Sequence, residues 1–318
     1  MAGAVGASTT GGGAAVNRRR AFTLIEVLIA VVIIGLLVGL LIPALGQARR
    51  SARATVGAAN LRSLNGVMNA YLNDFREIYL TPFKDRDPAQ SGGAYWFDAV
   101  APNDQLLYWR FQSADPESGT DAFMYYWYSF LSVYDGKPRF REEQISPDDA
   151  GIRTQANTLP EFWNDHNLLW PSSYVYSPVF WSDSGRYLGP WLPTDARSIA
   201  ANSQANVRSP AGKVVLFQRA DFVNSRAGEL LLSWNSPKAN TWVATADGSC
   251  SRVRMRDLMA AAERDNAMLP VELDRTFDSL PIVRSHGPLV AEFDVEEGGF
   301  PAFFKSTRFG IAGRDLQR

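Results

Sequence analysis

The sequence predicts an α+β protein in which a long N-terminal helix, hydrophobic and then amphipathic, packs on a C-terminal antiparallel β-sheet head. Three observations predict it: an apolar run near the N-terminus, an apolar stripe of helical spacing beyond it, and short strand-like runs late in the chain. The 318 residues are enough for about two domains. We expect a leader over 1–21, the helix over 22–80 and a globular head over 81–318.

The first half of the expected helix is almost free of charge. Residues 21–45 contain one ionisable side chain, Glu26. A helix of that length is roughly 37 Å long and can cross a ~30 Å hydrocarbon core. The uninterrupted apolar stretch, 27–42, is slightly short for a permanent span and longer than many signal-peptide cores. Length alone therefore leaves a membrane anchor and a cleaved signal both open.

The second half of the helix is predicted by its periodicity. Apolar residues recur at intervals of three and four, which draws one stripe along a helix; they are Leu61, Leu64, Met68, Tyr71, Leu72 and Phe75. A helix from Phe22 to about Phe75 would be roughly 80 Å long. The dipeptide Thr81-Pro82 is the expected stop.

The head divides by composition into an insertion over 83–208 and a sheet region over 209–318. The insertion holds most of the tryptophans and prolines, so few long helices are expected there. The sheet region has a hairpin turn, Asp247-Gly248, between two strand-like runs. The expected strands are Lys213–Phe217, Leu230–Trp234, Thr241–Thr245 and Ser251–Met255, and the expected short helix is Asp257–Met268.

The N-terminal residues carry a specific motif. Three arginines precede Ala21, and Phe22-Thr23-Leu24-Ile25-Glu26 then opens the apolar helix. This arrangement resembles the N-terminus of type IV pilins and type II secretion pseudopilins. The resemblance implies that a prepilin peptidase cuts between Ala21 and Phe22 and methylates the new amine of Phe22. Ala21 stands where the family usually has glycine.

Glu26 is the one costly residue of the apolar segment. A carboxylate inside such a helix costs roughly 2.5 kcal/mol or more unless it lies near the interface, is protonated or is paired. The resemblance implies a partner, because the ammonium of Phe22 in a neighbouring subunit would neutralise it in a filament core. We therefore expect Glu26 to guide assembly, and a carboxylate that merely reaches the headgroups is the alternative.

Three further residues of this segment bear on helix packing. Gly35 and Gly39 form a GxxxG step that permits close helix contact, although ordinary lipid-facing glycines give the same pattern. Pro43 falls where pilins place a proline, and it would bend or locally open the helix. We expect all three to give the helix flexibility.

The resemblance also implies partners and a location. It predicts a single-pass protein of the bacterial cytoplasmic membrane with its head exported to the periplasm or cell surface. Residues 22–45 would cross the membrane and later form the filament core. The implied partners are the prepilin peptidase, other pilin-like subunits, an inner-membrane assembly platform and a cytoplasmic ATPase. The filament would be a type II secretion pseudopilus or a type IV pilus-like fibre.

Two alternatives remain open at this point. Arg19-Arg20 also resembles a twin-arginine export signal, which would be cut beyond Ile42 and release a soluble protein. The aromatic run Phe123–Phe130 could present rings to a glycan or protein, which would make the chain a tethered binding module. Aromatic residues more often fill a core, so the same run also fits a buried strand or helix.

The composition gives no support for nucleic-acid binding, catalysis or a cofactor. The chain has 32 basic and 33 acidic residues, so no basic surface for nucleic acid is predicted. One cysteine and two histidines give no metal-ligand spacing, and no catalytic motif is present, so neither an enzyme nor a cofactor is predicted. Calcium is the only ion considered, because turn aspartates could ligate it; they are Asp85, Asp87, Asp148 and Asp149.

Overall fold

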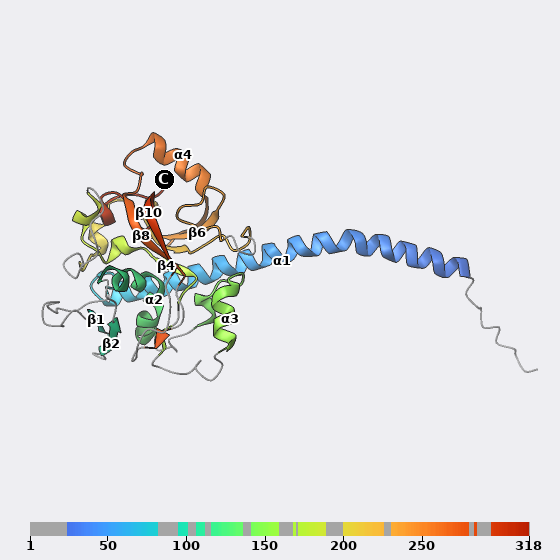
Figure 1. Ribbon diagram of the computed structural model, residues 1–318, viewed down its shortest axis with the longest axis horizontal. Helices are drawn as coiled ribbons and strands as arrows, with labels where there is room; N and C mark the ends of the chain where they lie inside the picture. The colour runs from blue at the N-terminus through green and yellow to red at the C-terminus, as the bar shows by residue number, and fades with distance from the viewer. Residues whose placement is uncertain are drawn as a thin grey trace, which may run out of the picture. The chain divides into compact units, whose positions relative to one another are not determined.

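The computed structural model divides into two compact units, 1–49 and 50–318. Figure 1 shows the elements along the chain. The residues that the structure describes are 24–81, 95–100, 106–111, 116–135, 141–158, 168–169, 171–188, 200–225, 230–279, 283–284 and 294–317.

Helix α1 (Leu24–Asp74) confirms the long N-terminal helix and carries Pro43 in its interior. It ends seven residues before Thr81, the predicted stop. Arg76 and Glu77 both adopt left-handed backbone conformations, with φ of 54° and 61°. The Glu77 N–H donates to the Leu72 carbonyl at 2.8 Å, which is the bond that closes a Schellman motif. The helix therefore ends in a local turn and does not extend to the proline.

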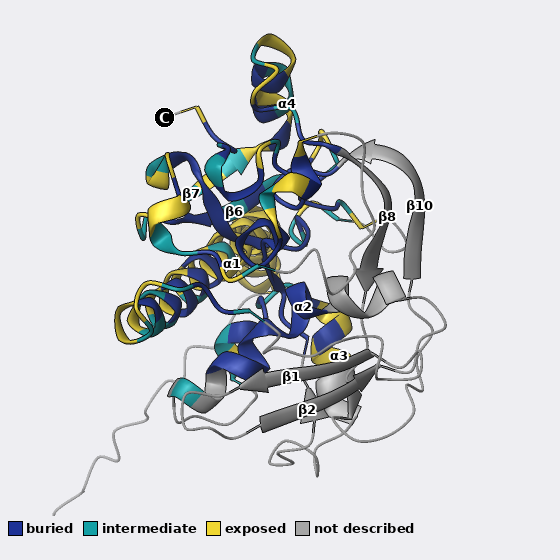
Figure 2. Ribbon diagram, turned by 90° about the vertical axis from the view of Figure 1, so that its left-hand side faces the viewer, coloured by how far each residue is buried: buried dark blue, intermediate teal, exposed yellow. Residues whose placement is uncertain are grey.

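The Arg50–Asp74 part of α1 is the central element of the head. It lies between the sheet on one side and α2 (Pro116–Asp135) and α3 (Ala150–Thr158) on the other (Figures 1 and 2). The predicted stripe is confirmed, because its central members are completely or almost completely buried; they are Leu61, Leu64, Met68 and Leu72. Burying each such side chain stabilises the head by about 1.5–3 kcal/mol.

The sheet has four antiparallel strands in the order β4-β5-β6-β7. The strands are β4 (Tyr174–Tyr176), β5 (Val214–Gln218), β6 (Asn240–Thr245) and β7 (Cys250–Arg254). The predicted hairpin is confirmed, and Gly248 takes the positive φ of 88° that its turn requires. Strand β4 comes from within 83–208, so part of the expected insertion belongs to the main sheet of the head.

Two further expectations in the sheet region can be compared with the structure. The strand expected at Leu230–Trp234 is wrong, because that segment forms turns and only a single bridge, between Leu232 and Ala220. The short helix is confirmed as α4 (Met255–Arg264), which begins two residues earlier than expected. Three two-stranded ladders complete the described strands: β1 (Tyr95–Val100) with β2 (Leu106–Phe111), β3 (Leu168–Leu169) with β9 (Val283–Arg284), and β8 (Glu272–Ser279) with β10 (Asp294–Pro301).

The aromatic run forms the buried middle of α2. Every residue of 123–130 is buried, and Figure 2 shows this part of the helix in dark blue. Trp127 Nε1 donates to the Tyr174 carbonyl at 2.8 Å, which satisfies the indole and ties α2 to β4. The rings of this run therefore belong to the core and present no surface for stacking against a sugar. A helix of 20 residues was not expected in this proline-rich region.

Buried ion pairs connect the loops of the head to its sheet. The Arg219 guanidinium lies 3.2 Å from the Asp149 carboxylate, and Lys213 Nζ lies 3.3 Å from that of Asp315. Burial lowers the pKa of Lys213, and the neighbouring Asp315 opposes that shift. Removing one member of such a pair leaves an unpaired buried charge, which is strongly destabilising.

Candidate functional site

The apolar end of α1 is the largest exposed hydrophobic surface among the described residues. Its side chains from Leu24 to Leu45 are exposed, by 46% or more for every large hydrophobic residue in that range. This is the one described helix that is long and apolar enough to cross a membrane, judged by length and composition. An exposed apolar surface of this extent normally marks contact with lipid or with another protein.

Glu26 lies in the first turn of α1 as the structure defines it, on an exposed position. A carboxylate near a helix N-terminus interacts favourably with the helix dipole. Gly35 and Gly39 also face open space, because an added Cβ at either would have no neighbour within 4 Å. At 100° per residue, the two glycines lie on the face of the helix opposite Glu26. The segment therefore offers two different contact faces.

The structure describes Pro43 but neither residue of the predicted cleavage site. Pro43 lies inside α1, one residue past the apolar stretch. Ala21 and Phe22 lie outside the described residues, so the cleavage site stays a prediction.

Residues 16–42 match the family model of the prokaryotic N-terminal methylation motif. The chain carries the type IV pilin and pseudopilin signature. The match includes Ala21, Phe22, Glu26 and both glycines, and it ends one residue before Pro43. No curated protein and no solved structure matches the chain.

The methylation motif and the apolar helix together fit a pilin-like subunit with a single-pass membrane anchor. The motif indicates a structural protein and implies processing by a prepilin peptidase. It covers only the first part of the chain, so it says nothing about the head.

Polar contacts attach the second half of α1 to the head. The Tyr174 hydroxyl donates to the Gly57 carbonyl at 2.9 Å, and Asn65 Nδ2 donates to the Thr245 carbonyl at 3.4 Å. Burial raises the pKa of Tyr174, so the phenol stays protonated and able to donate throughout the physiological range. These contacts could not be predicted from the sequence, because the two residues of each contact lie more than 100 positions apart.

The aspartates considered for calcium have other partners where the structure describes them. Asp148 pairs with Arg53 at 3.3 Å, and the buried Asp149 pairs with Arg219 and accepts the Ser173 hydroxyl at 2.7 Å. No group of three or more His, Cys, Asp or Glu able to hold a metal occurs within the described ranges. Asp85 and Asp87 lie outside them.

Proposed function

We propose that the chain is a pilin-like subunit that assembles through α1 into a type II secretion pseudopilus or type IV pilus-like filament. One observation carries the proposal: the methylation motif, residues 16–42, covers the beginning of a helix whose apolar side chains are exposed. Such a surface needs lipid or neighbouring helices to cover it. Lipid covers this surface while the subunit is stored in the bilayer, and neighbouring helices cover it in the filament.

In this proposal, cleavage between Ala21 and Phe22 creates the positively charged amine that pairs with the Glu26 carboxylate. The new ammonium of Phe22 in one subunit would pair with the Glu26 carboxylate of its neighbour. Each charge alone is costly in an apolar core, and pairing makes both tolerable. Gly35 and Gly39, on the opposite face, would let a further helix approach closely, and Pro43 would let the helix bend during assembly.

Residues 22–45 cross the cytoplasmic membrane in the stored form, with the head exported to the periplasm or cell surface. Loss of the leader changes the formal charge from −1 to −4, because three arginines and no acidic residue leave with it. The proposed partners are the prepilin peptidase, sibling subunits, an inner-membrane platform and an ATPase. The buried aromatic run supplies no binding surface for the alternative of a tethered glycan-binding module.

Substitution of Ala21 tests the proposed processing. In cells with the native peptidase, Ala21→Lys is expected to accumulate as the uncut chain of about 35.1 kDa, because a long charged side chain replaces the small residue before the cut. Ala21→Gly, which installs the usual family residue, is the matched control and should be cut at least as completely as the natural chain. Intact-mass measurement of the membrane fraction shows how completely each variant is cut. Complete cutting of Ala21→Lys at Phe22 would contradict a small-residue requirement at Ala21.

A further inference from the structure

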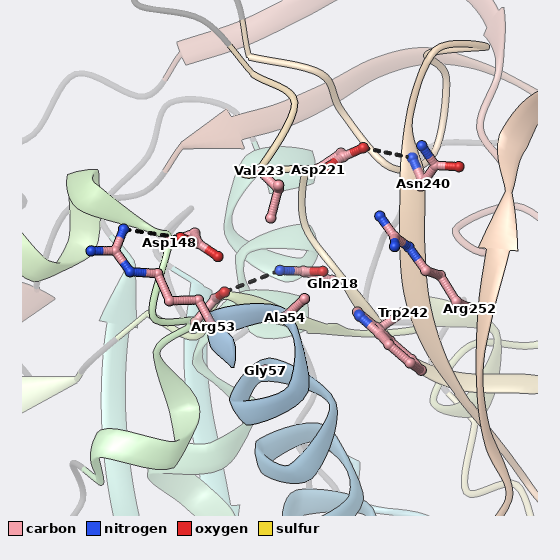
Figure 3. A pocket seen from close by; sticks show the side chains of 11 residues that line it. Arg53, Ala54, Gly57, Asp148, Gln218, Asp221, Val223, Asn240, Trp242 and Arg252 are labelled. Carbon is pink, nitrogen blue, oxygen red and sulfur yellow. Dashed lines mark hydrogen bonds and ion pairs between the residues drawn. The ribbon is translucent and has the colours of Figure 1, made fainter. Parts of the chain in front are cut away.

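The acid–base pairs of the head differ in their exposure to water and in the cation that they use. Figure 3 shows a pair at the surface, in which Arg53 faces Asp148 and the Arg53 side chain is 59% exposed. The pair of Lys213 and Asp315 is buried, with side chains that are 0% and 3% exposed. Lys213 Nζ lies 3.3 Å from Asp315 Oδ2. This pair therefore holds a primary amine against a carboxyl group away from solvent.

Backbone contacts hold the Asp315 carboxyl group against the start of β5. The N–H groups of Asp315 and Leu316 both donate to the Gly212 carbonyl, at 2.8 and 3.0 Å. In return, the Val214 N–H donates to Asp315 Oδ2 at 2.9 Å. The two residues that flank Lys213 thus bind the segment that carries the carboxyl group. These contacts fix its position beside the amine.

The Lys213 amine is also held in place. Nζ donates to the Gly310 carbonyl at 3.0 Å, and it lies 5.9 Å from the centre of the Phe180 ring. Gly310 has a positive φ of 57°, and an added Cβ there would lie 3.0 Å from side-chain atoms of Ser184 and Tyr187. Two groups held together in this way react as if at an effective concentration of about 10⁵–10⁸ M when they are well oriented.

Amide formation needs a neutral amine and a protonated carboxyl group. Burial lowers the pKa of Lys213, and the charge of Asp315 opposes that shift. Transfer of one proton from the ammonium to Asp315 Oδ2 gives both reactive forms at once. It also removes two charges from a site without solvent. The Thr307 hydroxyl donates to Oδ1, the other oxygen of the same carboxyl group.

We propose that Lys213 and Asp315 condense to form an isopeptide bond. After the first proton transfer, the Lys213 nitrogen attacks the carboxyl carbon and a C–N bond forms. Negative charge develops on Oδ1, where the Thr307 hydroxyl stabilises it as an oxyanion-hole donor does. The nitrogen then gives a second proton to the Oδ2 hydroxyl, the C–Oδ2 bond breaks, and one water leaves. The step needs no oxidant, reductant or second substrate.

The bond ties the end of the chain to a central strand of the sheet. It closes a loop of about 100 residues between Lys213 and Asp315, and a cross-link over so long a loop strongly restricts the unfolded chain. The C-terminal residues then stay on β5 when the rest of the head opens. This inference goes beyond the proposed function, because it concerns the head alone and holds whether or not the chain forms a filament.

Intact mass of the denatured full chain, purified in detergent, tests the inference. The natural chain should weigh one water less than its sequence and N-terminal processing give. Trypsin should release a branched peptide in which residues 209–219, uncut after Lys213, are joined to residues 315–318. Lys213→Arg keeps a positive charge beside Asp315, but a guanidinium stays protonated and cannot attack. This variant should show neither the water loss nor the branched peptide.

Lys238→Arg is the matched control, because Lys238 is an exposed lysine of the same head. It should keep both the water loss and the branched peptide. Thr307→Val removes the hydroxyl and should slow bond formation by a factor of roughly 10² to 10³, since it removes one oxyanion donor. Mass spectra taken at intervals after a pulse of synthesis measure this rate.

Three outcomes decide between the possible causes. A natural chain at its full mass would overturn the inference. A water loss that persists in Lys213→Arg would also overturn it, because the loss would then come from another dehydration, such as a succinimide at Asp247-Gly248. A chain that carries the branched peptide but never reaches the membrane would overturn the proposed function and support the inference.

Discussion

Glu26→Ala is expected to abolish assembly while leaving membrane insertion and cleavage intact. The substitution removes the carboxylate that pairs with the Phe22 ammonium of a neighbour. Breaking a buried pair by removing one partner costs about 3–5 kcal/mol. Since 1.4 kcal/mol is a tenfold change, subunit incorporation should fall by a factor of roughly 100 to 4,000. Quantifying the subunit in sheared or crosslinked filaments against the membrane pool measures this directly.

Glu26→Gln separates charge from shape at the same position. Glutamine keeps the length of the side chain but cannot neutralise an ammonium, so this variant should fail as Glu26→Ala does. Both variants should appear in the membrane fraction at the mature mass, because neither alters residues adjacent to the cut. Normal incorporation of Glu26→Ala would contradict the pairing mechanism, and normal incorporation of Glu26→Gln alone would show that the charge is not required.

The head is expected to unfold steeply above pH 10. Burial raises the pKa of four core tyrosines, namely Tyr79, Tyr126, Tyr174 and Tyr176. Below pH 10 these phenols are protonated in both states. Above it, the unfolded chain loses protons that the folded chain retains, so stability falls with rising pH. Each group removes about 1.4 kcal/mol per pH unit, so the four together remove about 5.6 kcal/mol by pH 11.

Urea denaturation of the full chain in detergent, followed by tryptophan fluorescence from pH 8 to 11, measures this loss. Tyr79→Phe is the informative variant, because the Tyr79 hydroxyl has no hydrogen-bond partner among the described residues. It should match the natural chain at pH 8 and exceed it by about 1.4 kcal/mol at pH 11. Tyr174→Phe should instead cost about 1 kcal/mol at pH 8, since it loses the bond to Gly57. A flat stability profile up to pH 11 would contradict the buried-tyrosine account.

The features that could be predicted from the sequence are those with a local cause. The apolar segment of α1 needs only the absence of charge, and the hairpin needs only Asp247-Gly248 between two strand-like runs. The methylation motif is equally local, since its residues are consecutive. These features do not depend on where the rest of the chain lies.

The features that were missed depend on contacts between distant segments. Strand β4 has three residues, and it is a strand because β5 pairs with it. Leu230–Trp234 has strand-like composition but only one bridge partner, so it turns instead. The helix α1 ends within one residue of the predicted Phe75, but the turn that ends it was not predicted, because it uses two non-glycine residues, Arg76 and Glu77, in left-handed conformations that no propensity favours.

N-terminal sequencing with intact mass tests the central claim most directly. The protein should come from the membrane fraction of cells that carry the native processing machinery. We predict a chain that begins at a methylated Phe22. A chain that begins beyond Ile42 would indicate an ordinary exported protein, and an uncut chain beginning at Met1 or Ala2 would indicate a simple tether. Either result would contradict the roles proposed for Ala21, Phe22 and Glu26.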